Sequence, residues 1–192
     1  MRTSFRIYRE ILAGHLLSPT NKFHQAVQSL CSSFVQATVQ LHLRCCSVFV
    51  PTANKFHYVF NMRDLTNVFM AVLFCSNDSV KTPKDMTRLW AHETQRAYRD
   101  KLAVSRDVET FDKAQVDILR KHFEDVDDGQ VISPLVFCHF AKGIGECKYA
   151  QIDKWRDLGK MLCVNVSWSH AIPALLGVIT RSLPCTPKCR GG

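Results

Sequence analysis

The chain has 192 residues, 46% of them hydrophobic and 22% charged, so it is long enough for one domain with a core, and nothing in its composition indicates general disorder. Its net charge of +8 favours anionic partners, but Lys and Arg are interleaved with Asp and Glu and form no basic run. No stretch approaches the roughly 18 apolar residues of a membrane span.

An N-terminal helix and a helix over residues 23–43 are predicted first. Arg6, Arg9 and Glu10 interrupt the apolar residues of the N-terminus, which therefore lacks the core of a signal peptide. Over 23–43, residues recur at intervals of three and four, the spacing of one buried helix face, and they are Phe23, Val27, Leu30, Phe34, Thr38 and Leu41. Pro51 ends this region.

A second helix is predicted over residues 63–74, after a short strand near residues 56–60. Its buried face is formed by Leu65, Val68, Phe69, Val72 and Leu73, and the polar run at 76–79 closes it. Arg63 stands at its start, where unpaired N–H groups attract anions and a cation is unfavourable unless an anion is present. Arg63 is therefore a candidate phosphate contact, and the alternative is an ion pair with Asp64 or with a carboxylate of the next helix.

The start of the third predicted helix, over residues 82–102, is the clearest. Thr82 suits the N-cap, Pro83 the first helical position and Asp85 the first turn. One face then carries Met86, Leu89, Trp90, Glu93 and Ala97. We expect Glu93 at the rim of this face, paired with a neighbouring Lys or Arg.

The fourth predicted helix covers residues 108–126, and less regular chain follows it. Its buried side is expected to hold Phe111, Ala114, Val116, Leu119 and Phe123. A short strand is predicted near residues 135–140, a last helix is predicted to start near residue 150, and an irregular tail begins at about residue 165. The sequence therefore predicts a mainly α fold with short extended segments and an irregular C-terminal tail.

Cysteines and glycines offer weaker candidate sites. Nine irregularly spaced cysteines do not suit a disulfide framework and indicate free thiols in a reducing, intracellular compartment. In AKGIG, at residues 141–145, the lysine precedes the glycines, the reverse of a P-loop, so a structural turn is favoured. The clusters of Cys138 and His139 with Cys147, or of Cys185 with Cys189, lack the paired spacing of zinc ligands, and we predict no metal site.

A longer run of residues resembles a known family. Residues 51–74 read PTANKFHYVFNMRDLTNVFMAVLF and resemble the lid of the third AAA+ module in dynein heavy chains, above all axonemal ones, where P-T-A-x-K-F-H-Y-x-F-N-x-R-D-L-[ST] is characteristic. The likeness continues through KTPKDMTRLWAHETQRAYRDKL at residues 81–102 and LVFCHFAKGIGECKY at residues 135–149, and covers roughly residues 5–160.

The resemblance implies an organisation and a site. Residues 1–20 would end the last helix of the AAA+ large subdomain, 21–130 would form the helical lid, 131–164 would lead toward the next AAA+ module, and 165–192 would be a non-matching, disordered tail. In AAA+ lids a sensor-2 arginine at the start of the third lid helix faces the γ-phosphate, and Arg63 holds that kind of position.

The resemblance also implies a function. A dynein lid would cover the nucleotide of the third module and couple it around the ring during ATP-driven movement on microtubules. Its partners would be the other AAA+ modules, intermediate and light chains and microtubules, and neither nucleic acid nor a membrane. The protein would lie in the cytoplasm, the cytoskeleton and the ciliary axoneme. The cofactor would be ATP, with Mg²⁺ in the full-length parent. Because the Walker A and Walker B residues would precede residue 1, we expect no catalysis by this chain alone.

Two other functions are open to the residues themselves. The chain could be a basic helical module that binds acidic proteins or nucleic acid, which steep salt dependence would reveal. It could also be a small enzyme that uses Cys138, His139 or Glu93. A nucleophile built from Cys138 and His139 is disfavoured, because adjacent residues of a strand point to opposite faces.

Overall fold

The computed structural model describes residues 2–123, 136–139, 149–152 and 156–160. Within them, helices dominate and one short antiparallel hairpin follows. The elements are α1 (Arg2–Leu16), α2 (Gln25–Ser29), α3 (Cys31–Val48), the 3-10 turn η1 (Ala53–Lys55), α4 (Met62–Val72), α5 (Pro83–Ala97), the 3-10 turn η2 (Arg99–Lys101), α6 (Ser105–His122), β1 (Val136–Cys138) and β2 (Ala150–Ile152). Residues 156–160 are helical as well.

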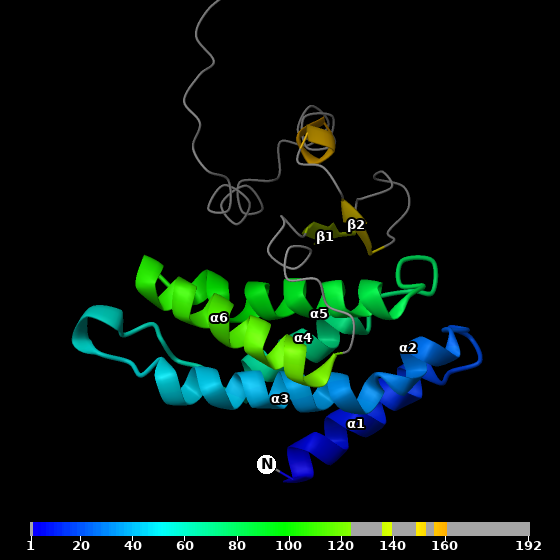
Figure 1. Ribbon diagram of the computed structural model, residues 1–192, viewed down its shortest axis with the longest axis horizontal. Coiled ribbons are helices and arrows are strands. Elements are labelled where there is room, and N and C mark those ends of the chain that lie inside the picture. The colour runs from blue at the N-terminus through cyan, green and yellow to red at the C-terminus, as the bar shows by residue number, and fades with distance from the viewer. Residues whose placement is uncertain (1, 124–135, 140–148, 153–155, 161–192) are drawn as a thin grey trace, which may run out of the picture.

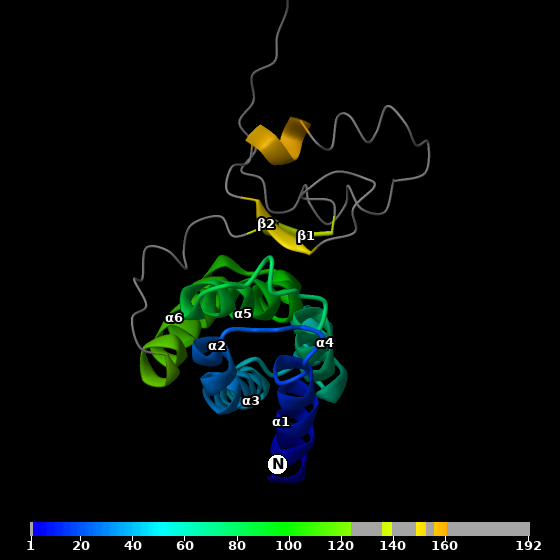
Figure 2. The same cartoon turned by 90° about the vertical axis from the view of Figure 1, so that its right-hand side faces the viewer.

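The helices pack in two layers, with the hairpin beyond them. α1 and α3 lie on one side of the body and α4, α5 and α6 on the other, and β1 and β2 lie over α5 (Figure 1). The view turned by a quarter shows α4 and α6 at opposite edges of the upper layer (Figure 2). α3 packs against both α1 and α6, and α4 packs against α5, so the two layers share one core.

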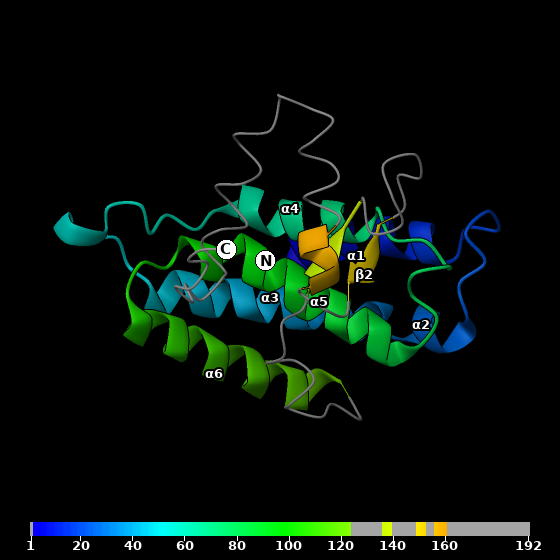
Figure 3. The ribbon, with the colours of Figure 1, turned by 90° about the horizontal axis from the view of Figure 1, so that it is seen from above.

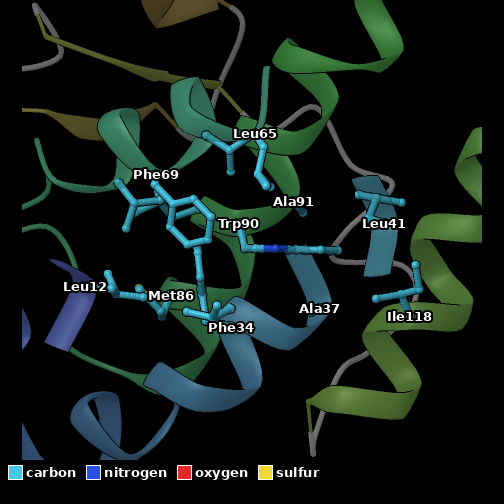
Figure 4. Packing of buried hydrophobic residues seen from close by; sticks show 14 of the residues in the cluster. Leu12, Phe34, Ala37, Leu41, Leu65, Phe69, Met86, Trp90, Ala91 and Ile118 are labelled. Atoms are coloured by element: carbon cyan, nitrogen blue, oxygen red, sulfur yellow. The ribbon is translucent and has the colours of Figure 1, made fainter. Parts of the chain in front are cut away.

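Trp90 on α5 lies at the centre of that core. Its side chain is fully buried, and Figure 4 shows it among residues of several helices, including Phe69, Leu41 and Ile118. Trp90 Nε1 donates a hydrogen bond of 2.8 Å to Thr38 Oγ1. A buried indole N–H without a partner would be destabilising, so this bond fixes how α5 sits on α3.

The helix predicted over residues 23–43 is two helices. The N–H of Leu30 bonds to the Val27 carbonyl at 3.2 Å, three residues back, which ends α2 and lets α3 begin at Cys31. Gln28 Nε2 donates to the carbonyls of Leu16 and Phe23 and so anchors α2 to the preceding segment. The predicted buried face is confirmed except at Leu30, which is half-buried.

The starts of α4 and α5 agree with the prediction. Thr82 caps α5: its hydroxyl accepts from the Asp85 N–H at 3.2 Å, and Asp85 Oδ2 accepts from the Thr82 N–H at 2.9 Å. Pro83 is the first helical residue, where no N–H is needed. These reciprocal bonds are why the start of α5 could be located in the sequence.

Four predicted features are wrong in detail. Residues 56–60 form no strand, and the described chain there runs from a 3-10 turn into an irregular segment. Ala150–Ile152 is a strand and not the start of a helix: it pairs with β1, Val136 opposite Ile152. On α6, Ile118 is buried where Val116 was expected, because two helical positions are about 200° apart on the helix surface. Leu73 of the face predicted for α4 is half-buried.

The strand predicted near residues 135–140 is confirmed as β1. None of the helices described has both the length and the apolar character needed to span a membrane. Several earlier expectations lie outside the described residues: the glycine turn at 141–145, Cys147, Cys185, Cys189 and the tail from residue 165.

Candidate functional site

The start of α4 is held by side chains on both sides of Arg63. Asn61 is the N-cap residue, and its Oδ1 accepts the Arg63 N–H at 2.9 Å. Asp64 Oδ2 reaches back to accept the Asn61 N–H at 3.0 Å. The two short polar side chains thus satisfy N–H groups that a helix start leaves unpaired.

Asp64 also ties α4 to the end of α5. Its other oxygen, Oδ1, pairs with Lys101 Nζ of η2, and only 6% of Asp64 is exposed. The Lys101 ammonium lies 5.5 Å from the centre of the Phe60 ring as well. Asp64 therefore serves the fold, and its charge is already compensated by a residue 37 positions away.

The segment before α4 is fixed by a second carboxylate. Asp107 of α6 pairs with Lys55 Nζ and accepts the Tyr58 hydroxyl proton at 2.9 Å. Tyr58, which is 1% exposed, also accepts the Ala103 N–H at 3.0 Å. The hydrogen bond from Lys55, with that from Tyr58, lowers the pKa of Asp107 below its usual value, so the carboxylate stays charged at neutral pH.

Aromatic packing completes this support. Phe49, Tyr58 and Phe60 meet one another with ring centres 6.1 to 6.4 Å apart, and Phe60 lies 5.9 Å from Tyr98 at the end of α5. The projecting loop that these residues close is seen from above in Figure 3, where it leads from α3 to α4. The rings hold the chain entering α4 in one place.

Arg63 is the exception in this region. Its side chain is exposed, and among the described residues its guanidinium has no hydrogen-bond or ion-pair partner. The alternative of an ion pair with Asp64 is therefore not realised, because Asp64 is engaged with Lys101 and the Asn61 N–H. A cation at the second position of a rigidly capped helix is available to an external anion.

The face of α4 that carries Arg63 is also apolar. Met70 follows Arg63 at helical spacing, seven positions on, and is 50% exposed, and Phe74 in the turn after α4 is 57% exposed. The opposite face packs on α5, and Thr66 on the flank meets the Tyr8 hydroxyl of α1 at 2.7 Å. Arg63 therefore stands on the side of α4 that the other described helices leave uncovered.

Glu93 is not at the rim, and the expectation of a Lys or Arg partner is wrong. It is 6% exposed, and its Oε1 lies 3.1 Å from His92 Nδ1 and accepts the hydroxyl proton of Tyr149. The hairpin covers this face of α5, and that contact joins residues 56 positions apart. The sequence showed that Glu93 is a carboxylate on an apolar helix face. It did not show which residue Glu93 would contact.

The five cysteines that the structure describes give no sign of a reactive or metal-binding site. Among the described residues Cys31, Cys45 and Cys75 are buried, and all five described cysteines are free thiols. Burial raises the pKa of Cys45 and Cys75 to about 12, so both stay protonated at neutral pH. Within the described parts of the chain, no three potential ligands gather as a metal site would require.

Comparison with known proteins gives one family match. The AAA+ lid domain matches residues 34–133, which run from α3 through α6. The match therefore includes the capped start of α4, Arg63 and the Asp107 contacts.

Curated relatives are similar over most of the chain. The ciliary dynein beta chain of Tripneustes gratilla is 43% identical over 176 residues, which cover 90% of this chain and 4% of the relative. Dynein axonemal heavy chain 17 of Homo sapiens is 38% identical over 174 residues, which again cover 90% of this chain and 4% of the relative. The flagellar outer-arm dynein alpha chain of Chlamydomonas reinhardtii is 35% identical over 162 residues, 82% of this chain and 4% of the relative. The chain thus spans only about 4% of the length of these relatives.

Proposed function

The chain belongs to the AAA+ lid domain family and is a lid region of a dynein heavy chain, and from this premise we propose that it covers the nucleotide site of the third AAA+ module. The observation that supports this most is the state of Arg63, an exposed arginine without a partner among the described residues. The neighbouring carboxylate, Asp64, is already paired with Lys101.

Arg63 would act as a sensor of the γ-phosphate. The positive end of α4 and the guanidinium both favour an anion at this point. The exposed apolar side chains of Met70 on the same face and of Phe74 just after α4 would meet the domain that holds the nucleotide. The lid would then close more firmly on ATP than on ADP, because only ATP offers the γ-phosphate.

We further propose the division of the chain and its role in the parent. Residues 1–20 would end the large subdomain, 21–130 would be the lid, and 131–164 would lead to the fourth module and carry the nucleotide state onward. In the parent, ATP with Mg²⁺ would drive movement along microtubules in the ciliary axoneme, with the other AAA+ modules and the intermediate and light chains as partners. This follows the names of the relatives, which are ciliary, axonemal and flagellar dyneins.

The test uses a dynein heavy chain that contains this lid. We expect Arg63→Ala to weaken ATP binding about 10-fold or more, the size of a lost charge-assisted hydrogen bond, and to change ADP binding little. Binding of the two nucleotides is measured by titration calorimetry. The matched control is Arg106→Ala, since Arg106 is another exposed arginine at the second position of a helix, α6.

Equal loss of ATP and ADP affinity in Arg63→Ala would contradict the sensor role and indicate a general effect on the site. An equal effect of Arg106→Ala would show that net charge matters, and not the position of Arg63.

A further inference from the structure

Two buried polar residues of α5 face the hairpin and are not explained by the packing of the helices. His92 and Glu93 are each 6% exposed. Both lie under β1 and the chain that enters β2, where Figure 2 shows the hairpin above α5. Their position places them between the helical body and the segment that follows it in the chain.

A continuous chain of hydrogen bonds links the two parts. The Phe137 N–H of β1 donates to His92 Nε2 at 3.4 Å, and His92 Nδ1 lies 3.1 Å from Glu93 Oε1. The Tyr149 hydroxyl donates to the same Glu93 oxygen. Both arms of the hairpin are therefore tied to adjacent residues of one helix.

The direction of these hydrogen bonds defines which atoms carry the protons. Because His92 Nε2 accepts a backbone N–H, the ring proton of a neutral His92 is on Nδ1 and is donated to Glu93. Burial, followed by the Glu93 carboxylate, raises the pKa of Tyr149, so its hydroxyl keeps its proton and can only donate to a carboxylate. Glu93 is then the acceptor on which both donors converge.

The contacts of Glu93 come from polar neighbours. Its Oε1 lies 3.1 Å from His92 Nδ1 and accepts from the Tyr149 hydroxyl. Cys75 and Tyr149 lie close enough for the Glu93 charge to act on their pKa values. A buried carboxylate compensated in this way depends on the donors that the hairpin brings.

Apolar contacts accompany these hydrogen bonds but do not fix the position of the hairpin. The Phe137 ring lies 5.3 Å from His92 and 5.9 Å from Tyr149, measured between ring centres. On the outer side His139 lies 5.2 Å from Phe74, which is largely exposed. Ring contacts of this kind persist when one ring slides over the other. A hydrogen bond to a buried charge requires one geometry, and only water can replace its donor.

We propose that His92, Glu93 and Tyr149 form a polar latch that docks the hairpin β1–β2 on α5 and lets it detach as a unit while the helices stay folded. In the docked state the hairpin supplies the donors for Glu93, and in the detached state water supplies them. The latch goes beyond the proposed nucleotide site and rests on the proposed function only for its effect in the parent motor.

Hydrogen exchange of the 192-residue chain tests the latch. We expect Tyr149→Phe to speed amide exchange in β1 and β2 by roughly 10-fold or more, because it removes one hydrogen bond to a charged group. Exchange in α3 and α5 should be unchanged. Glu93→Gln should act in the same direction, because it removes the charge of the acceptor. The double variant should be faster than either single variant by less than the two effects combined, because both act on the bond between Tyr149 and Glu93.

Tyr8→Phe is the matched control. It also removes one tyrosine hydroxyl with a bond between distant segments, to Thr66 on α4, but does not touch the hairpin. Unchanged exchange in β1 and β2 of Tyr149→Phe would overturn the latch and leave apolar packing and the backbone pairing of Tyr149 with Cys75 as the cause of docking. Equal acceleration in the hairpin and in α5 would overturn it as well, since Tyr149 would then support the whole fold.

Nucleotide plays no part in this experiment. A failed latch therefore leaves the role of Arg63 open to its own test, and a failed Arg63 test leaves the latch standing.

Discussion

Asp64 and Arg63 are neighbours in sequence and have opposite surroundings. Asp64 is buried, caps α4 and pairs with Lys101, whereas Arg63 is exposed and has no partner among the described residues. Successive residues of a helix point about 100° apart, so one can face the core while the other faces outward. The charged pair at this junction therefore consists of a structural carboxylate and an available cation.

His42 gives a prediction at the residue scale. It is 4% exposed, and its Nδ1 lies 3.0 Å from the Tyr98 hydroxyl. Burial lowers the pKa of His42 below its ordinary value of 6.5, although Asp64 acts in the opposite direction. Between 6.5 and the lowered value, the unfolded chain binds more protons than the folded one, so the free energy of unfolding falls as the pH falls through this window.

We expect His42→Gln to make this fall shallower below pH 6.5, measured by urea unfolding at a series of pH values. His57→Gln is the control, because it removes the same kind of side chain from an exposed position. If the free energy of unfolding changes with pH equally in His42→Gln and in the unchanged chain, His42 is not the source of the pH dependence.

Asp107 gives a prediction at the scale of one element, the loop from residue 49 to residue 60. Its carboxylate receives both Lys55 and the Tyr58 hydroxyl, so Asp107→Ala leaves a buried hydroxyl without its acceptor. We expect proteolysis after Lys55 to become faster while α3 and α5 keep their protection from hydrogen exchange, because the loss is local.

Glu109→Ala is the control for that change. Glu109 is an exposed carboxylate on the same helix, so its loss should not alter cleavage of the loop. If Asp107→Ala instead speeds exchange throughout the helices, the loop contacts are part of the global fold and not a local clamp.

Elements with their own local signals could be predicted, and elements fixed by distant contacts could not. Thr82, Pro83 and Asp85 specify the start of α5 within four residues, and the sequence located it. The alternating aromatic residues at 56–60 suggested a strand, but Tyr58 turns inward to meet Asp107, and no neighbouring chain pairs with this segment in the described structure. Ala150–Ile152 became a strand because β1 lies beside it.

In the candidate site, too, local features could be predicted from the sequence and distant contacts could not. Arg63 could be selected because its type is unusual at a helix start. The partner of Asp64 is 37 positions away and that of Glu93 is 56 positions away, and periodicity carries no information about either pairing. Sequence reasoning therefore found the exposed residue and misjudged the buried carboxylate.

At the scale of the whole molecule, the core makes the helices one body. Trp90 bonds to Thr38 on α3 and its ring lies 5.7 Å from that of Phe123 after α6, while Gln115 of α6 donates to the Ala91 carbonyl and to Thr94 on α5. α4 is joined to α5 through Asp64 and Lys101. Arg63 and the latch are thus carried by helices that cannot move independently without breaking buried bonds.

That rigidity gives the last prediction. If ATP draws Arg63 toward a phosphate, α4 and α5 move together, and the hairpin follows only while the latch is closed. In a dynein heavy chain with this lid, we expect ATP in place of ADP to change hydrogen exchange in β1 and β2, and Tyr149→Phe to remove this response without changing ATP affinity. Arg63→Ala should remove the response together with the preference for ATP. A hairpin response that persists in Tyr149→Phe would mean that nucleotide state reaches the following segment by another route, because the only described bond from that tyrosine to α5 would be absent.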